Sequence, residues 1–475
     1  MKKQIAVIGI EMHCELKSNS KVFSSAKNAY SVIPNTNINP LDMAFPGTMP
    51  VVNLKCVRDA LKMSMVLNCK QPEYMFFDRK NYYYPDLPKG YQITQSTSPV
   101  GIDGSIAIEC NNKIITVGIH DIHLEEDTAK LDHLDNMSLL DYNRAGIPLL
   151  ELVTTPCMHS ADEVMAFIEH IRLMYQYCDI SDADIRKGQI RCDVNISIMD
   201  EDATEFGTKV EVKGVDFSGI RGTIDYEIDR QIKLKSEGRY DEVEQETRRW
   251  DEASGTTIRM RSKVDAIDYK YFVEPNIPKF RITQALLEDI RKEIPVFALE
   301  RKNLYINKYG LDETNARIII KDRFVADYFE KCIALGIDAK IAANWITGLI
   351  TSYINKEGIS VNDFYLKPEY LKQIIDALNK GEISSKQAKE IFAKACDEKK
   401  EPANYISSDN KQISDEKYIE EIIDNILANN EENIIAYQNG KTNMFDFFVG
   451  QVMKETKGKA NPIITKELIH QRIDK

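Results

Sequence analysis

Acidic and imidazole side chains alternate along a short segment near the start of the chain. Within residues 7–16, Glu11, His13 and Glu15 recur with a period of two, and apolar residues fill most positions between them. Because successive side chains point to opposite faces of a β-strand, a strand here would carry two carboxylates and an imidazole on one face. These are the side chains of acids and metal ligands, although a polar strand face is often only solvated. The segment predicts a candidate site if other segments converge on it.

Residues 116–130 carry a second acidic row. If they form a strand, one face holds Asp121, His123, Glu125 and Asp127. Carboxylates this close repel one another unless a cation or open solvent relieves them. A hard divalent cation is the economical explanation, since Mg²⁺ prefers carboxylate oxygen and keeps water molecules that can contact phosphate.

A single carboxylate interrupts the apolar run at residues 147–153. This residue, Glu151, follows two leucines and precedes Leu152. Burying it without a partner would be costly, so we expect Glu151 to face a ligand or a partner protein.

Two alternating runs, at residues 190–198 and 209–213, predict a β-hairpin. Its polar face would combine Arg191, Asp193, Asn195, Lys209, Glu211 and Lys213. A solvated hairpin face is the alternative. Asp and Asn are poor strand formers, however, so a reason other than strand propensity has placed them here.

Residues 77–92 (FDRKNYYYPDLPKGYQ) mix basic and aromatic side chains in what we expect to be a loop stiffened by two prolines. Lys80, Asn81 and Tyr82 lie at its centre. Such a mixture suits stacking on a base and neutralisation of phosphate. The alternative, which composition alone slightly favours, is a structural tyrosine cluster with hydrogen-bonded hydroxyls.

The elements that must position these groups differ between the two parts of the chain. Up to about residue 280, short strands, tight turns and a few helices alternate, whereas the sequence after Pro278 is mostly helical. Another hairpin is expected over residues 246–261. It carries four arginines suited to bidentate contacts with phosphate or carboxylate, namely Arg248, Arg249, Arg259 and Arg261.

Composition narrows the class of protein. The 475 residues are 43% hydrophobic and contain no run long enough to span a membrane. The N-terminus lacks the features of a signal peptide, and the nine cysteines are scattered without a C-x-x-C pair, as in reduced cytoplasmic proteins. The net charge of −12 argues against non-specific binding of nucleic acid by the surface as a whole.

The C-terminal segment departs from that acidic balance. From residue 440 onward, seven Lys or Arg residues stand against four acids, which gives 7 − 4 = +3. Four lysines lie within about twenty residues: Lys441, Lys454, Lys457 and Lys459. This end of the chain is a candidate for contact with a polyanion, with a solvated lysine face as the alternative.

Seven segments together resemble one family. In order, they are VIGIEMHCEL, FFDRKNYYYPDLPKGYQI, IHLEEDTAK, NRAGIPLLELV, IRCDVNIS, FGTKVEVK and ETRRWDE. They resemble the B subunits of the glutamine-dependent aspartyl/glutamyl-tRNA amidotransferases, and the resemblance covers nearly the whole chain. It implies an α+β fold in three parts: a mixed-sheet catalytic cradle domain (1–290), a helical domain (291–405) and a small YqeY-like tail domain that contacts tRNA (410–475).

The resemblance also implies a two-step reaction and its partners. ATP phosphorylates the side-chain carboxylate of Glu on tRNA(Gln) or Asp on tRNA(Asn), and ammonia then displaces phosphate to give the amide. The ammonia comes from a separate amidase subunit, A, through an internal channel, while a small subunit, C, wraps the two. Phosphoryl transfer of this kind needs positioning and charge neutralisation more than a nucleophilic side chain.

Carried over by position, the family's Mg²⁺ and nucleotide pocket falls on Glu11, His13, Glu125 and Glu151. The neighbouring face would be lined by Asp193, Asn195, Lys209 and Glu211, and Lys80, Asn81 and Tyr82 match another motif of the family. The basic tail residues match the part that contacts tRNA. Which carboxylates touch the metal stays open.

The chain departs from the family at one place. Many members carry zinc-binding cysteines after the first strand and again before the next Pro-Gly, but residues 23–25 and 39–47 contain no cysteine here. The resemblance therefore predicts no structural zinc, and we expect packing to hold this loop.

Two other functions remain open from the residues alone. The acidic groups could be the solvated face of a non-catalytic tRNA-binding protein. They could also serve a metal-dependent hydrolase that acts alone, since His and carboxylates bind zinc or manganese.

Overall fold

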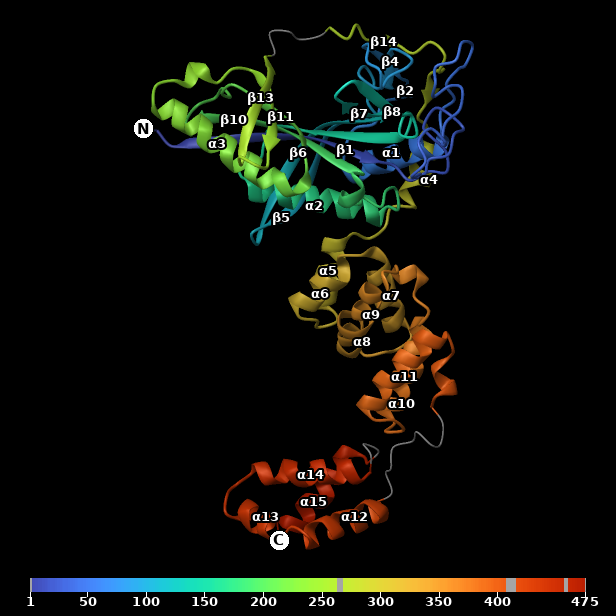
Figure 1. Ribbon diagram of the computed structural model, residues 1–475, viewed down its shortest axis with the longest axis vertical. Coiled ribbons are helices and arrows are strands. Elements are labelled where there is room, and N and C mark those ends of the chain that lie inside the picture. Colours follow the sequence, from blue (N-terminus) through green and yellow to red (C-terminus); the bar gives the residue numbers. More distant parts are fainter. Residues whose placement is uncertain (1, 263–267, 407–415, 457–459, 475) are drawn as a thin grey trace. The chain divides into compact units, whose positions relative to one another are not determined.

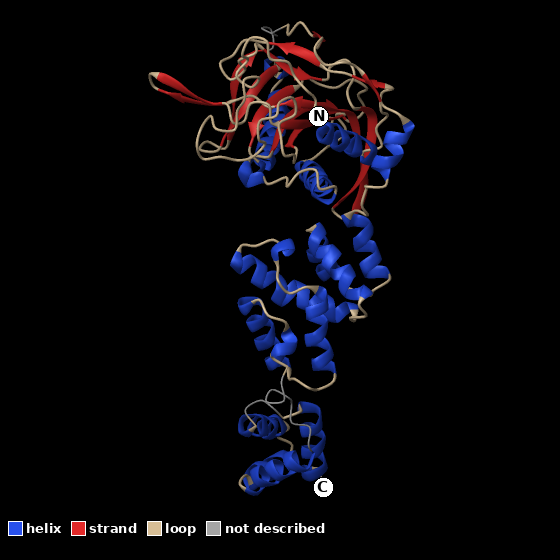
Figure 2. Ribbon diagram, turned by 90° about the vertical axis from the view of Figure 1, so that its right-hand side faces the viewer, coloured by secondary structure: helices blue, strands red, loops and turns tan. Residues whose placement is uncertain are grey.

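The computed structural model describes residues 2–262, 268–406, 416–456 and 460–474. The chain divides into two compact units, Met1–Phe297 and Ala298–Lys475. All strands lie in the first unit, and the second is built from helices (Figure 2). The finer division into domains at residues 290 and 405 stays a prediction.

Eight strands of the first unit form one mixed sheet in the order β13-β12-β11-β10-β1-β9-β6-β5 (Figure 1). Neighbouring strands run antiparallel except β11 and β12, which run parallel. The strands are β1 (Gln4–Glu15), β5 (Gly101–Cys110), β6 (Lys113–Glu126), β9 (Pro148–Thr154), β10 (Ile190–Asp200), β11 (Val210–Val215), β12 (Glu246–Asp251) and β13 (Thr256–Ser262). The expected α+β fold and both expected hairpins are confirmed. Strand β1 lies inside the sheet and is not a solvated edge.

Three small sheets accompany the large one, in the orders β14-β3-β4, β15-β2 and β7-β8. Their strands are β2 (Tyr74–Met75), β3 (Asp78–Asn81), β4 (Tyr91–Thr94), β7 (Lys130–Leu134), β8 (Met137–Asp141), β14 (Phe272–Val273) and β15 (Phe280–Arg281). The expected loop over residues 77–92 is therefore wrong at both ends, which are strands. Local composition could not show this, because the partner strand β14 comes from nearly 200 residues further along the chain.

Helices cover the apolar face of the large sheet. They are α1 (Leu54–Val66), α2 (Ala161–Tyr177) and α3 (Ile220–Ser236), and α4 (Gln284–Arg291) packs against α1. Figure 1 shows α2 and α3 along one side of the strands. On β1, Ile8, Ile10, Met12 and Cys14 are fully buried beneath this layer. The alternating polar residues of β1 consequently project from the opposite face.

A buried ion pair helps to hold the loop between β1 and α1. The ammonium group of Lys21 lies 3.3 Å from Asp42 Oδ2, and both side chains are almost fully buried. Asp42 also accepts hydrogen bonds from Ser24 Oγ (2.8 Å) and the backbone N–H of Asn39 (2.9 Å). Lys21 donates to the carbonyl of Tyr142 at 3.2 Å. Apolar packing, which we expected from the sequence, is thus supplemented by an ionic cross-link between residues 21 and 42.

The second unit consists of α5 (Ala298–Asn307), α6 (Glu313–Ile320), α7 (Arg323–Ala334), α8 (Ala339–Trp345), α9 (Thr351–Glu357), α10 (Pro368–Asn379), α11 (Ser385–Glu398), α12 (Glu416–Ala428), α13 (Glu431–Gln438), α14 (Asn443–Glu455) and α15 (Pro462–Ile473). The last four helices enclose a small core of their own, with Ile419, Ile423, Phe448, Val452 and Ile469 at its centre. Within the described residues, none of the helices combines the length and apolarity needed to cross a membrane.

Candidate active site

Strand register brings three functional side chains into one row across the polar face. His13 on β1 is paired with Glu151 on β9, and Glu151 is paired with His123 on β6. His13 Nε2 lies 3.2 Å from Glu151 Oε2 and 3.8 Å from Oε1 of Glu125, which follows His123 by two residues on β6. One potential ligand atom from each of His13, Glu125 and Glu151 lies within 4.8 Å of the others. We refer to these three residues as the first cation group.

A second set of three carboxylates lies on the same face. Glu11, two residues before His13, is paired with Asp193 on β10, and one oxygen of each lies within 4.8 Å of an oxygen of Glu211 on β11. Asn195 Nδ2 donates to Glu11 Oε1 at 3.0 Å. Glu11, Asp193 and Glu211 form the second cation group.

The residues that the sequence assigned to one Mg²⁺ site thus divide between two groups. His13, Glu125 and Glu151 come together, whereas Glu11 joins Asp193 and Glu211, which the sequence placed on the neighbouring face. Asn195 contacts the second group. The division follows from strand geometry, because Glu11 and His13 are two positions apart on β1 and have different partners on each side.

The first cation group has more negative charge than its surroundings neutralise without protonated histidines. Burial alone would lower the pKa of His13, but Glu151 and Glu125 outweigh it and raise that pKa to about 8. Burial and the nearby Glu151 raise the pKa of Glu125. Burial would also raise the pKa of Glu151, yet the imidazoles of His123 and His13 hold it well below its usual range. A divalent cation at this position could replace protons as the compensating charge.

Lys80 is the member of its segment that is electrostatically linked to the first cation group. Burial would lower its pKa, but Glu125, with further support from Glu151, raises it. Its ammonium group also lies 5.1 Å from the centre of the Tyr269 ring. Asn81 instead donates to the backbone carbonyls of residues 269 and 270, at 3.3 and 2.7 Å. Tyr82 packs edge-on against Tyr269 at 6.1 Å, so the structural tyrosine cluster is present beside the candidate site.

Lys213 occupies the place beside the second cation group that the sequence assigned to Lys209. Its ammonium group lies 2.9 Å from both Asp193 Oδ2 and Glu211 Oε1. Lys209 precedes β11 and is exposed. Among the described residues, it makes no hydrogen bond or ion pair with this group. The alternation of residues 209–213 could have singled out Lys213, because it shares the polar face with Glu211.

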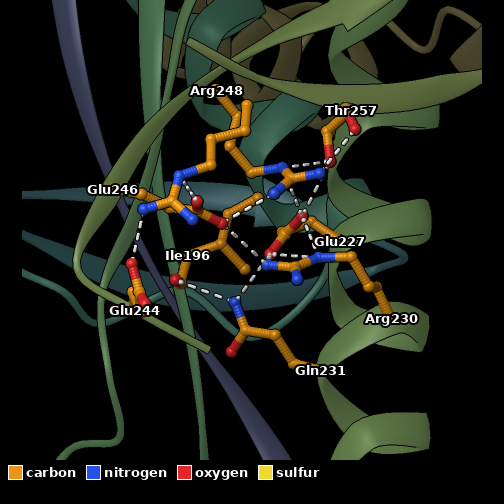
Figure 3. Close-up of polar contacts among 9 residues, drawn as sticks. Ile196, Glu227, Arg230, Gln231, Glu244, Glu246, Arg248 and Thr257 are labelled. Atoms are coloured by element: carbon orange, nitrogen blue, oxygen red, sulfur yellow. Dashed lines mark hydrogen bonds and ion pairs between the residues drawn. The ribbon is translucent and has the colours of Figure 1, made fainter. Parts of the chain in front are cut away.

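The arginine hairpin contacts the chain's own carboxylates. In Figure 3, Arg248 donates to Glu246 (2.6 Å) and to Thr257 Oγ1 (2.8 Å), and Arg230 on α3 pairs with the fully buried Glu227. Further ion pairs join Arg259 to Glu244 and Glu246, and Arg249 to Asp251. The side chain of Arg261 lies outside the described residues.

This buried network connects β12 and β13 to α3, and β12 in turn supports the second cation group. Thr247 on β12 donates from Oγ1 to Glu211 Oε2 at 3.0 Å. The structure therefore gives most of the hairpin arginines an internal role instead of the phosphate contacts considered from the sequence.

A cavity of about 480 Å³ opens next to the first cation group. Its lining includes Glu15 on the polar face of β1 and the cationic residues Lys17, Lys130 and Arg144. Burial and the nearby Asp127 raise the pKa of Glu15 to about 7. The cavity is large enough for part of a nucleotide or an aminoacylated nucleotide end.

The basic residues of the tail are only partly described. Lys441 and Lys454 are exposed. Lys457 and Lys459 lie outside the described residues.

Comparisons with known proteins cover both units. A family model described as "GatB/GatE catalytic domain" matches residues 6–288, and one described as "GatB domain" matches residues 327–473. A relative from Trichodesmium erythraeum is 40% identical over 99% of this chain and 98% of its own length. Relatives from Persephonella marina and Oceanobacillus iheyensis are 40% and 41% identical, with 98% of each chain covered. All three are named as B subunits of an aspartyl/glutamyl-tRNA(Asn/Gln) amidotransferase. The chain therefore belongs to the family of aspartyl/glutamyl-tRNA(Asn/Gln) amidotransferase B subunits.

Proposed function

We propose that this chain catalyses the ATP-dependent amidation of Glu on tRNA(Gln), of Asp on tRNA(Asn), or of both. In the first step, a side-chain carboxylate oxygen attacks the γ-phosphorus of ATP, an acyl phosphate forms and ADP leaves. In the second step, the nitrogen of ammonia attacks the acyl carbon and phosphate leaves with the bridging oxygen. The relatives are named as parts of a tRNA amidotransferase, which supports this reaction class.

Divalent cations fit both cation groups by the chemistry of the donors. The first group offers one imidazole nitrogen and two carboxylates, and the second offers three carboxylates. Carboxylate oxygen with at most one imidazole suits Mg²⁺ or Mn²⁺, whereas neither group offers the thiolates typical of structural zinc. When bound, such cations would neutralise charge on the phosphates of ATP.

The chain's own cations would complete the pocket. Lys80 beside the first group and Lys213 beside the second can donate to phosphate oxygens, each as a compact positive charge. Thr94 Oγ1 donates to Glu125 Oε2 at 3.3 Å and helps to orient that carboxylate. The cavity beside Glu15 offers space for a substrate next to the first group.

The single observation that carries this proposal is the presence of two three-ligand groups on one sheet face, in a chain of this family. A solvated acidic face on a non-catalytic tRNA-binding protein does not require carboxylates from four strands to converge. A stand-alone hydrolase would not require tRNA. The reaction needs free thiols to stay reduced and tRNA to be present, so we place the protein in the cytoplasm.

ATP consumption by the full-length protein, assembled with its partner proteins, tests the proposal. We expect ADP to form with Glu-tRNA(Gln) or Asp-tRNA(Asn), and not with the correctly charged or uncharged tRNAs. ATP hydrolysis that ignores the tRNA would support a hydrolase. Binding of misacylated tRNA without ATP consumption or amidation would support the non-catalytic alternative.

We further propose that the working form is a complex with an amidase subunit, A, and a small subunit, C. The relatives carry names that make each of them one part of a multi-subunit enzyme, which supports such an assembly. Because the described site contains no nucleophile that would release ammonia from glutamine, the purified lone chain should not amidate with glutamine. Free ammonium should replace it as nitrogen donor. Amide formation from glutamine by the lone chain, measured with ¹⁵N-amide-labelled glutamine, would contradict this prediction.

The tail is proposed to bind the phosphate backbone of tRNA. Lys441 and Lys454 are exposed on it, and phosphate contacts add affinity that weakens as salt rises. Replacing both by Ala should raise the Kd for tRNA and reduce the salt slope of log K by about 1 to 2. Deleting residues 410–475 should have a larger effect in the same direction while ATP binding persists. Equal affinities and equal slopes in a salt series would mean that the tail does not contact tRNA.

A further inference from the structure

Two residues outside both cation groups form a chain of hydrogen bonds that ends on Glu151. His123 Nδ1 lies 2.8 Å from Asp121 Oδ1, and His123 Nε2 lies 3.1 Å from Glu151 Oε2. Asp121 and His123 are both on β6, two positions apart, and the strand register sets His123 beside Glu151. All three side chains are largely buried, with 14–16% of their surface exposed.

The contact fixes one particular oxygen of Glu151. Oε2 of Glu151 also lies 3.2 Å from His13 Nε2, so two imidazoles approach the same carboxylate oxygen from the two neighbouring strands. A Glu side chain has three rotatable bonds, and without His123 only His13 would restrain this carboxylate within the described part of the site. Once His13 used Nε2 for a cation, His123 would be the remaining donor to that oxygen.

We propose that Asp121 and His123 are a positioning pair, in which Asp121 orients the imidazole and the imidazole orients the Glu151 carboxylate toward a divalent cation. This inference rests on the proposed function, because it takes the first cation group as a cation site. Residues that orient metal ligands in this way typically change metal affinity by about 10- to 100-fold when they are replaced. Neither residue touches the substrate or the cation in this proposal, so neither is a catalytic residue.

Mn²⁺ binding to the full-length protein, followed by electron paramagnetic resonance, measures the effect without relying on activity. Asp121→Ala should raise the Kd of the Mn²⁺ site that Glu151→Gln removes by about 10- to 100-fold. Asp121→Asn keeps an oxygen that accepts from Nδ1 and should lose less affinity. His123→Gln keeps a donor near the position of Nε2 and should bind Mn²⁺ more tightly than His123→Ala.

His120 provides a matched control. It lies one residue away, its Nδ1 is 2.7 Å from the other oxygen of Asp121, and its side chain is 71% exposed. His120→Ala should leave the Mn²⁺ affinity within about twofold, since His120 does not contact Glu151. Thermal unfolding of each variant checks that a loss of affinity does not reflect a loss of folding.

The outcomes separate this inference from the proposed function. If Glu151→Gln binds Mn²⁺ as the unchanged protein does, the first group is not a cation site and the proposed function loses its support. If Glu151→Gln loses the site while Asp121→Ala and His123→Ala retain full affinity, only the positioning pair is refuted. Equal affinities for His123→Gln and His123→Ala would also contradict it, because the pair acts through a donor to Oε2.

Discussion

Replacing Glu125 by Gln is expected to lower the rate of ATP-dependent amidation by about a hundredfold or more. The change keeps the size of the side chain and its contact with Thr94, but removes one of the two carboxylate charges of the first cation group. That charge would hold the cation that neutralises the transferred phosphate, so its loss acts on the barrier to phosphoryl transfer. Amidation of misacylated tRNA by the assembled complex measures the effect, and glutamine hydrolysis by the amidase partner should continue.

Glu201 offers a control for this substitution. It forms an exposed ion pair with Lys3 at the far end of β10, away from both cation groups. Glu201→Gln should amidate at the unchanged rate. Wild-type amidation by Glu125→Gln would refute the assignment of Glu125 to the cation site.

Removing the Asp42 carboxylate should have the largest effect on stability. Asp42→Ala leaves the Lys21 ammonium group without its ionic partner in a site where both side chains are almost fully buried. Breaking a buried ion pair by removing one partner typically costs about 3–5 kcal/mol. We expect a lower midpoint of urea unfolding for the first unit. Amide hydrogens of Val22 and Asn53, which are bonded to the carbonyls of Gly146 and Val22, should exchange faster.

An exposed ion pair in the same unit provides the comparison. Lys2 and Asp202 lie 2.8 Å apart with about two thirds of each side chain exposed. Asp202→Ala should shift the midpoint little, because exposed ion pairs are weak. If Asp42→Ala and Asp202→Ala unfold at the same urea concentration, packing alone holds the loop and the Lys21–Asp42 pair is incidental.

Alternation along single strands could be predicted from the sequence. The polar positions of β1 are Glu11, His13 and Glu15, as their period of two indicated, and the hairpin of β10 and β11 forms as expected. These predictions hold because the hydrophobic pattern of a strand determines which face is buried. Local patterns also predicted the helical second unit.

The composition of each cation group could not be predicted, because it depends on register between strands far apart in the sequence. His13 meets Glu151, whereas Glu11 meets Asp193, and only the pairing of β1 with both β9 and β10 decides this. His123 lies in the same row for the same reason. A bulge between Cys192 and Val194 shifts the register of β10 against β11 in the region where Lys213 reaches Asp193. Contacts of this kind are tertiary information that residue types and spacing do not contain.

The fate of one oxygen atom tests the central claim most directly. Glu-tRNA(Gln) labelled with ¹⁸O in the side-chain carboxylate is incubated with ATP, a nitrogen donor and the assembled complex. If this chain phosphorylates the carboxylate, each amide formed releases one phosphate that carries one ¹⁸O atom from the substrate, as mass spectrometry of the phosphate would show. Amide formation with only unlabelled phosphate would mean that no acyl phosphate forms, and would contradict the function proposed for the two cation groups.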